Sequence, residues 1–432
     1  MPKQTFCIFF LMSEPVSKST FSFNAAAHLG VSLFFISLLS TRNIYSVGVA
    51  ILLLATVSGY LVCSQTRRSM QSQSISRGLY TILTLTFAYG LLIWFLHQNP
   101  GNQLDLLSRY LLLVPILYML SSIRMHSNVI WVCFALGTLS ALWIIPAQYG
   151  GSLHDGRIYG YTGAIQFGNI ALSLACFCLT AILSQLSQQH RSTTVLLLSV
   201  LGCLAGFLLS LLSGSRGGWI ALPVVFLILA YAYLPKQHFR RGVMILSLAA
   251  LLSASILWQT DTIQSRVALA QHDIEQFEAG NANTSIGARF AIWQANWTLI
   301  KEQPFSGWSY AQHQQALEDL VKDGQADPVV LKLANSHNNY IETWVDWGLA
   351  GLLLQCSLLL YCFYGFIRRV HSSDTLTRAY ATCGSIVVAV YILANLTQNM
   401  MERNNTLLFF LISVAIFWSQ IYPNQAKRHS AT

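Results

Sequence analysis

Long apolar runs, separated by short polar segments, dominate the chain. A run of about 20 apolar residues is long enough to cross a bilayer as a helix, so each run predicts a transmembrane helix. The ten-residue alternation of a membrane β-barrel does not occur. The pattern therefore predicts an all-α polytopic membrane protein with about 12 transmembrane helices. The predicted helices span residues 21–39, 44–63, 79–97, 106–123, 129–149, 162–186, 193–212, 219–234, 242–258, 341–367, 379–396 and 404–421.

The longest polar segment, residues 259–340, separates the ninth predicted helix from the tenth. Apolar residues recur in it at helical spacing, which predicts amphipathic helices lying over one mouth of the bundle. We therefore divide one integrated membrane domain into residues 1–258 with helices 1–9, the 259–340 helical loop, and residues 341–432 with helices 10–12 and a short tail. The three apolar stripes of the loop are Ile263, Val267, Ala270, Ile274 and Phe277; Phe290, Trp293, Trp297 and Ile300; and Ala316, Leu317, Leu320 and Val321.

Composition excludes the soluble and disordered classes of protein. Of the 432 residues, 54% are apolar and only 9% are charged, whereas soluble proteins are about 25% charged. Eight of the nine cysteines lie in the apolar runs and none lies in the 259–340 loop. We therefore expect neither a disulfide nor a thiolate metal site in that loop.

An uneven distribution of charge orients the predicted helices. One set of alternate loops, with both termini, holds fifteen basic and two acidic residues, whereas the other side holds ten basic and fourteen acidic residues. By the positive-inside tendency the first side is cytoplasmic, so we expect both termini in the cytoplasm and the 259–340 loop on the outer side. The net charge of +9 thus follows from topology, and we expect no nucleic-acid partner.

Three arginines and a histidine stand in motifs at the outer ends of the predicted helices. A guanidinium at a glycine-lined turn suits a phosphate, because it is permanently charged, has forked donors and leaves room for backbone N–H groups. A neutral histidine accepts a proton near neutral pH. The motifs are Arg157-Ile158-Tyr159-Gly160-Tyr161-Thr162-Gly163 with Asn169; Ser215-Arg216-Gly217-Gly218; Arg289 with Trp293; and Ser336-His337-Asn338-Asn339-Tyr340.

Simpler interpretations stay open for each of these residues. Arginines near helix ends often reach lipid headgroups or pair with a carboxylate, and a lone loop histidine is more often a surface residue. No metal-binding motif occurs, so we expect no metal and no other cofactor. Asp155, Glu342 and Asp346 lie near the motifs and are candidates to orient His337 or the arginines. Five other histidines lack such motifs and are predicted to have no role in the site: His28, His97, His154, His272 and His313.

The motifs, in this order and on one side, resemble those of the O-antigen ligases and their relatives, the O-antigen polymerases and bacterial protein O-oligosaccharyltransferases. The resemblance covers most of the chain, and one departure is Gly307-Trp308-Ser309, where relatives often have a second glycine. Its more specific parts are Arg157 with Thr162, Gly163 and Asn169; Ser215-Arg216-Gly217-Gly218; Arg289 with Trp293, Ala295, Pro304 and Gly307; and His337-Asn338-Asn339-Tyr340 with Trp344, Gly348 and Gly351.

The resemblance implies a fold like that of the glycosyltransferase C superfamily, in the bacterial inner membrane with its active site facing the periplasm. It implies inverting, metal-independent transfer of a glycan from a polyprenyl (undecaprenyl) diphosphate carrier to a hydroxyl of the lipid A core oligosaccharide. His337 is then the expected base, and Arg216 and Arg289 are expected to stabilise the leaving diphosphate. The expected substrate-binding residues are Arg157, Asn169, Ser215, Gly217, Trp293, Asn338 and Tyr340.

Other functions stay open from the sequence. An O-antigen polymerase uses a second carrier-linked glycan as acceptor, and a protein O-oligosaccharyltransferase uses serine or threonine. Relatives of the latter kind tend to carry a longer C-terminal soluble portion, whereas only about ten residues follow the last predicted helix here. Outside the class, the chain is a candidate transporter of a lipid-linked glycan, although the repeated halves that are common in transporters are not evident.

Overall fold

A computed structural model describes residues 18–62, 77–149, 157–235, 237–242, 244 and 261–422. Within these ranges every regular element is a helix, so the predicted all-α class is confirmed. The helices are α1 (Lys18–Ser37), α2 (Ile44–Val62), α4 (Arg77–Leu96), α5 (Asn102–Ser121), α6 (Ser127–Leu139), α7 (Ile144–Tyr149), α8 (Ala164–Leu186), α9 (Thr193–Leu212), α10 (Arg216–Trp219), α11 (Leu222–Tyr233), α13 (Asp261–Glu278), α14 (Ser285–Glu302), α15 (Tyr310–Lys322), the 3-10 helix η1 (Pro328–Lys332), α16 (Asn339–Ile367), α17 (Thr375–Ala394) and α18 (Asn404–Ile421).

Eight helical segments of the described chain are long and apolar enough to cross a membrane. Three shorter apolar helices, at Asn24–Ser37, Ile44–Tyr60 and Gly217–Tyr233, match further predicted runs. The protein is thus a multi-pass membrane protein. The predicted ninth run, residues 242–258, lies almost wholly outside the described residues, so the count of 12 stays a prediction.

Close helix packing, rather than the hydrophobic effect, holds a bundle together in lipid, because lipid tails are as apolar as the side chains. Small residues therefore mark the contacts. Gly202 and Gly206 lie four residues apart on α9, and a Cβ at Gly206 would stand 2.8 Å from the Ala171 carbonyl oxygen of α8. The Thr138 hydroxyl of α6 donates to the Gly202 carbonyl at 2.8 Å. These approaches join α6, α8 and α9 tightly.

Helices α8, α17 and α18 form the centre of the bundle, since most of their side chains are buried. Phenylalanines fill the space between them and α6. Phe177 of α8 meets Phe417 of α18 edge to face, with ring centroids 5.1 Å apart, and stacks on Phe409 at 6.1 Å. Such aromatic packing holds these helices in fixed positions. The candidate site lies at one end of the same helices.

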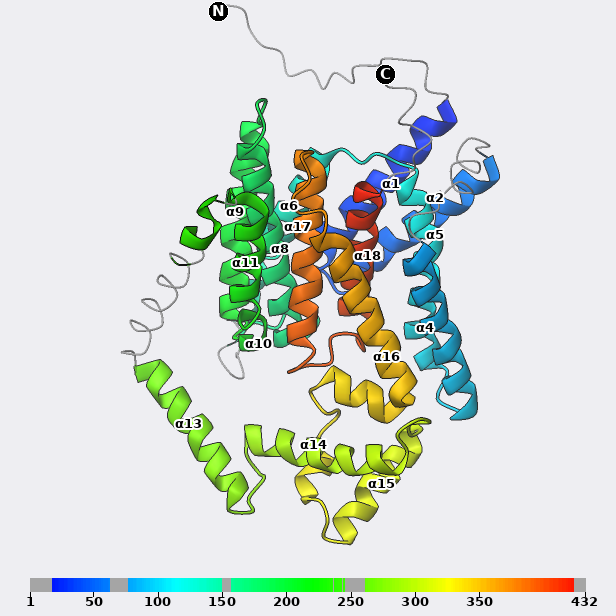
Figure 1. Cartoon of the computed structure of the whole chain (residues 1–432), viewed down its shortest axis with the longest axis vertical. Coiled ribbons are helices and arrows are strands. Elements are labelled where there is room, and N and C mark those ends of the chain that lie inside the picture. Colours follow the sequence, from blue (N-terminus) through cyan, green and yellow to red (C-terminus); the bar gives the residue numbers. More distant parts are fainter. Residues whose placement is uncertain are drawn as a thin grey trace, which may run out of the picture.

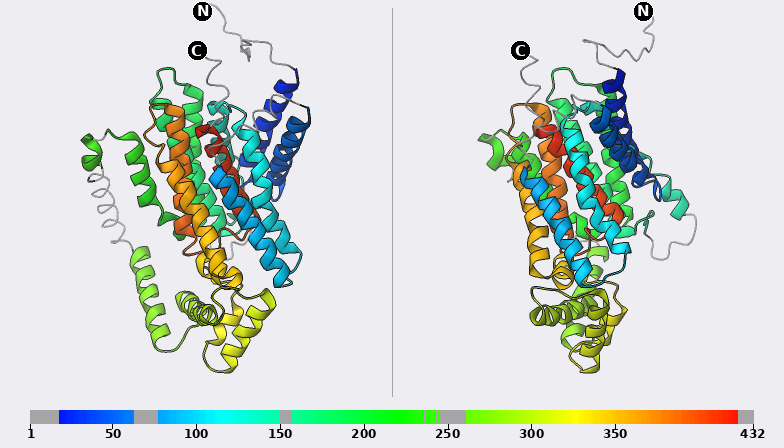
Figure 2. Two further views of the ribbon diagram at one scale, coloured as in Figure 1. Left: turned by 45° about the vertical axis from the view of Figure 1, so that its right-hand side comes forward. Right: turned by 90° about the vertical axis from the view of Figure 1, so that its right-hand side faces the viewer.

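The predicted loop helices form a separate layer beyond one end of the bundle, where Figures 1 and 2 show α13, α14 and α15. Their own small core includes Ile292, Leu299, Leu317 and Val330. The stripe predicted on α14 is partly wrong, since Trp297 is 48% exposed. The reason is that α14 packs through its small face, which buries Ala288, Ala291 and Ala295 beside Ile292 and Leu299.

A break in α16 joins this layer to the bundle. Gly348 has φ 65° and ψ −174°, and Gly307 in the facing turn has φ 68°. The Trp308 N–H donates to the Val345 carbonyl at 2.7 Å, and the Leu349 N–H donates to the Pro304 carbonyl at 2.8 Å. The turn at Pro304–Trp308 therefore supplies hydrogen-bond partners to the broken helix, whose first turns Figure 1 shows lying across the end of the bundle.

The sequence departure in this turn has a structural explanation. Ser309 is the N-cap of α15: its hydroxyl accepts from the Gln312 N–H at 3.3 Å, and the Gln312 side chain accepts from the Ser309 N–H at 3.2 Å. This reciprocal capping box satisfies two donors that would otherwise be unpaired. A second glycine at this position would lose it.

We expect Gly348→Ala to lower the thermal unfolding midpoint in detergent strongly. Its φ and ψ lie in a region open essentially only to glycine, where strain costs roughly 1–3 kcal/mol. A Cβ there would also collide with the Phe305 carbonyl oxygen.

The matched control is Gly324→Ala, because Gly324 also has a positive φ of 70° but has nothing within 4 Å of its Cβ position. Gly324→Ala should shift the midpoint much less. Equal shifts in the two variants would show that the contact between the turn and α16 does not hold the loop layer.

Candidate functional site

The candidate residues lie where the bundle meets the loop layer. Figure 1 shows α10, the start of α16 and the connection between α17 and α18 at the end of the bundle that faces α13–α15. The segment 336–340 enters this region just before α16. Asn338 is the N-cap of that helix, and its side-chain oxygen accepts from the Tyr340 and Ile341 N–H groups at 3.0 and 3.3 Å. The predicted motif thus begins a helix at the site.

His337 adopts an unusual backbone conformation, with φ 53°. Left-handed φ is strained for a residue with a side chain, and such strain concentrates at functional positions. The neighbours hold it in place. The Asn335 side chain accepts from the His337 N–H at 3.0 Å, and the Ser336 hydroxyl donates to the Asn338 carbonyl at 2.8 Å. The local hydrogen bonds therefore fix the direction in which the His337 side chain extends from the backbone.

The imidazole of His337 is oriented by one side chain. Its Nδ1 lies 3.0 Å from Oε1 of Gln398. Because an amide oxygen only accepts, Nδ1 carries the proton in this arrangement and Nε2 keeps its lone pair. Nε2 has no hydrogen-bond partner among the described residues. The half-buried ring is thus set up to accept a proton at Nε2.

Gln398 belongs to residues 395–403, the connection between α17 and α18, which the sequence interpretation missed. The Asn395 carbonyl accepts from the Asn339 N–H at 2.8 Å. The Met401 N–H donates to the Asn339 side chain at 2.7 Å. Gln398, Asn395 and Met401 are all buried. Their amide-rich sequence, Asn395-Leu396-Thr397-Gln398-Asn399, was the available signal, since so polar a stretch is seldom buried between membrane helices without a role.

The connection 395–403 also contacts the second predicted motif. The Ser215 hydroxyl donates to the Asn169 side-chain oxygen at 2.9 Å, and the Asn169 amide lies 3.4 Å from the Met400 sulfur. A Cβ at Gly217 would stand 2.6 Å from the Thr397 hydroxyl. Asn169, Ser215 and Gly217 are therefore brought together with the connection that orients His337.

The structure describes the predicted arginines to different extents. Arg157 is half-buried, and a Cβ at Gly214 would lie 2.9 Å from its Nε, so glycine leaves room for the guanidinium stem. Arg216 begins α10, but its side chain lies outside the described part of the structure. Asp155 is outside the described residues altogether. The placement of the Arg216 side chain is therefore still a prediction.

Arg289 lies on α14 one turn before Trp293, so the two share a face of that helix. The Trp293 indole donates to the Ser336 carbonyl at 2.7 Å, which ties this face to the residue before His337. Burial lowers the pKa of the half-buried Arg289 from its ordinary value, although a guanidinium stays charged. Across the described chain neither Arg157 nor Arg289 forms an ion pair, so both charges are free to meet an anion.

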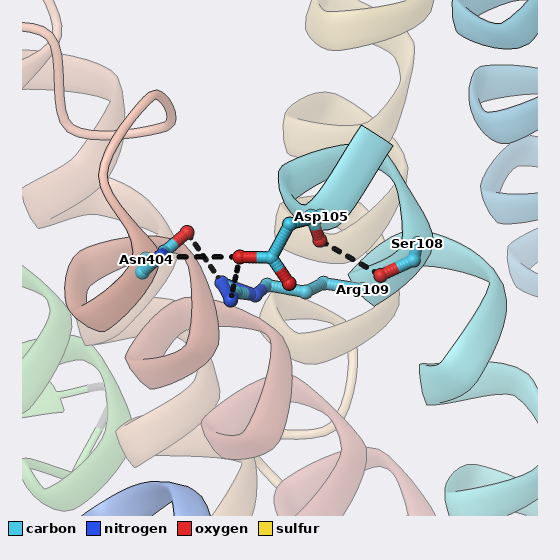
Figure 3. A network of polar contacts seen from close by, with 4 residues as sticks. All are labelled: Asp105, Ser108, Arg109 and Asn404. Atoms are coloured by element: carbon cyan, nitrogen blue, oxygen red, sulfur yellow. Dashed lines mark hydrogen bonds and ion pairs between the residues drawn. The ribbon is translucent and has the colours of Figure 1, made fainter. Parts of the chain in front are cut away.

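A neighbouring arginine is neutralised instead. Arg109 of α5 donates to the Asp105 carboxylate at 2.8 Å and to the Asn404 side chain at 2.6 Å, as Figure 3 shows. Asn404 also donates to Asp105 at 3.3 Å. This network fastens α5 to the first residue of α18. Arg109 is thus a structural residue, in contrast to Arg157 and Arg289.

Three carboxylates stand near His337. Glu342 accepts from the Ser336 N–H at 2.7 Å, so it supports the backbone of the motif and does not contact the imidazole through a hydrogen bond. Glu402 accepts from Asn399 at 2.7 Å and from Asn339 at 3.2 Å. Burial, together with the charges of Glu342 and Asp346, raises the pKa of the Glu402 carboxyl well above its ordinary value. No three His, Cys, Asp or Glu side chains of the described chain are placed to hold a metal ion.

One other histidine is buried in the loop layer. His313 of α15 lies 2.9 Å from the Asn296 side-chain oxygen, and burial lowers its pKa to about 4. It packs between α14 and α15 rather than beside the candidate residues. This is consistent with the prediction that it has no role in the site.

Comparison with known proteins bears on the same region. Residues 201–356 match the family model described as O-antigen ligase. An uncharacterized protein of Haemophilus influenzae (strain ATCC 51907 / DSM 11121 / KW20 / Rd) is 28% identical over 403 residues, which cover 92% of this chain and 98% of that protein. The O-antigen ligase of Escherichia coli (strain K12) is 25% identical over 237 residues, 54% of this chain and 55% of the relative.

The matched residues include Ser215, Gly217, Arg289, His337 and Asn338. The resemblance that the motifs indicated is confirmed over residues 201–356, which match the O-antigen ligase family model.

Proposed function

We propose that this protein transfers a glycan from a polyprenyl diphosphate carrier to a hydroxyl of the lipid A core oligosaccharide. The observation that carries the proposal is the position of His337. Gln398 orients its ring, and the connection that bears Gln398 also contacts Asn169 and Gly217. A candidate base and a candidate anion site are thus parts of one packed unit.

The chemistry follows from these groups. The acceptor hydroxyl oxygen attacks the anomeric carbon of the donor sugar, and the bond from that carbon to the diphosphate oxygen breaks with its electron pair. The hydroxyl proton passes to Nε2 of His337. Arg216 and Arg289 stabilise the negative charge that develops on the leaving diphosphate. Because the attack is a direct displacement, the anomeric centre inverts. No acid is needed, since a diphosphate leaves without being protonated, unlike the alkoxide in glycoside hydrolysis.

Orientation in the bacterial inner membrane is part of the proposal. The opposite end of the bundle from the site holds Arg368 and Arg369 after α16 and Arg378 in α17. The positive-inside tendency makes that end cytoplasmic. The site, the loop layer and the acceptor then lie in the periplasm.

The deciding experiment incubates the purified full-length protein with a polyprenyl diphosphate-linked glycan and one acceptor at a time. Lipid A core, a second carrier-linked glycan and a serine-containing peptide are the three acceptors. The proposal expects product only with lipid A core. Product with another acceptor alone, or none with any, would overturn it.

Arg289→Ala should lower the single-turnover transfer rate about 100-fold or more, because it removes a charge-assisted contact to the leaving diphosphate. Arg216→Ala should behave alike. Lysine at either position should rescue only part of the rate, since the forked donor geometry is lost.

The matched control is Arg368→Ala, an exposed arginine at the other end of α16 that stacks on Tyr364. It should transfer at the wild-type rate. Full activity in an alanine variant that inserts normally would remove that arginine from the mechanism.

His337→Asn should lower the transfer rate roughly 100- to 10,000-fold while donor binding changes little. Asparagine tolerates the left-handed backbone conformation, so the variant isolates the loss of the base. Wild-type transfer should also fall on acidification, because an imidazolium has no lone pair to accept a proton.

The measurement is single-turnover transfer from a preformed donor complex across pH. The residual rate of His337→Asn should lack the acidic fall of the wild type. An identical acidic fall in both proteins would show that another group is the base and that His337 only positions substrate.

Transfer should persist in excess EDTA, because the positive charges assigned to the diphosphate are arginines. Turnover is measured before and after chelation, with EDTA added to the donor and protein together. Loss of turnover that Mg²⁺ or Mn²⁺ restores would contradict the expectation and would direct attention to Asp155, Glu342 and Asp346.

A further inference from the structure

A cavity of about 290 Å³ opens beside the segment that bears His337. Its walls come from α4, α5, α16 and the turn before α15, and they include Asn335 and Asn339, on either side of His337 in the chain. Glu342, Asp346 and Glu402 all line it, and we call it the acidic cavity. Its volume is at the small end of the range for ligand pockets.

Two polar side chains in the acidic cavity have no partner in the part of the chain that the structure describes. Asp346 makes no hydrogen bond or ion pair with any described residue, whereas Glu342 and Glu402 are held by Ser336 and Asn399. Gln355 is 7% exposed, and within the described ranges neither its Nε2 nor its Oε1 has a hydrogen-bond partner. Buried polar groups are nearly always paired, so an unpaired amide that lines a cavity indicates a ligand that pairs with it.

The free groups define the chemistry of that ligand. Gln355 offers an amide NH2 group as donor and an amide oxygen as acceptor, and Asp346 offers acceptor oxygens and, when protonated, an O–H donor. A hydroxyl both donates and accepts, so a molecule with several hydroxyls satisfies both side chains. Trp94, Trp308 and Trp347 also form part of the walls, and indole rings pack well on the C–H face of a sugar ring. These features together favour a carbohydrate.

The charges around the acidic cavity indicate whether it binds the donor sugar or the acceptor sugar. The three carboxyl groups of the acidic cavity offer no positive charge to a phosphate, whereas the unpaired Arg157 and Arg289 attract it. The donor sugar is bonded directly to the diphosphate and so belongs with the arginines. The acceptor sugar has to reach Nε2 of His337 but need not carry a phosphate.

We propose that the acidic cavity binds a terminal, unphosphorylated sugar ring of the acceptor, with hydrogen bonds to Asp346 and Gln355. This inference rests on the proposed function, because it takes the acceptor to be a glycan. It makes Asp346 and Gln355 determinants of acceptor specificity. In the direct displacement proposed above, the acceptor hydroxyl then attacks the anomeric carbon from the side opposite to the leaving diphosphate.

The test measures binding without donor, so that it does not depend on transfer. Dephosphorylated lipid A core oligosaccharide is titrated into the purified full-length protein, and the fluorescence of the cavity tryptophans is followed. Asp346→Asn and Gln355→Leu should each weaken binding at least fivefold. Asp323→Asn and Gln294→Leu, at exposed positions of the loop layer, are the matched controls and should bind like the wild type.

Transfer kinetics supply the second arm. The two cavity variants should raise the KM for the acceptor and leave the KM for the donor unchanged, with thermal unfolding midpoints near that of the wild type. Wild-type affinity for the oligosaccharide in both variants would overturn the inference while leaving the proposed function intact. A raised donor KM would overturn it too, by assigning the cavity to the donor sugar. If wild-type protein binds the oligosaccharide and the variants do not, the inference stands even where no transfer is detected and the proposed function fails.

Discussion

The contact between Gly307 and Gly348 is the constraint on which the rest of the site depends. A Cβ at Gly307 would lie 2.7 Å from the Gly348 nitrogen, so the two backbones meet without side chains between them. This close approach coincides with the break in α16. Backbone groups of α16 that the break leaves unpaired form hydrogen bonds with the turn at Pro304–Trp308. The first turns of α16, with Asn338 at their N-cap, are thereby held against the loop layer while the remainder of the helix runs through the bundle.

Neutral hydrogen bonds, rather than ion pairs, hold the candidate residues in place. Amides of Asn339 and Gln398 make contacts that join the 336–340 motif to the connection 395–403, and the Asn338 amide caps α16. An ion pair could also hold side chains in place, as the pair of Arg109 and Asp105 does in α5. At the site it would consume the charge of Arg289, which the proposed function assigns to the diphosphate, because a paired guanidinium attracts phosphate less.

The apolar pattern predicted most of the helices, because a membrane span leaves a continuous signal of about 20 residues. The motifs with Asn169, Ser215 and His337 were also recognisable, since each lies at a helix end. The role of Gln398 was not, because it lies 61 residues from His337 and contacts it through one hydrogen bond without periodicity. The exposure of Trp297 was missed for a related reason: the alanines that let α14 pack closely carry little hydropathy of their own.

Basic and acidic side chains lie in different parts of the site. Unpaired arginines stand on α14 and before α8, whereas Glu342, Asp346 and Glu402 gather around the acidic cavity. The arginines attract phosphate, whereas the carboxyl groups of the acidic cavity offer it no positive charge. A displacement at carbon needs its nucleophile and leaving group on opposite sides. In the proposed function, the arginines would attract the diphosphate donor, and the acidic cavity would take the uncharged acceptor. The inverting mechanism that we propose is thus compatible with this separation of charge.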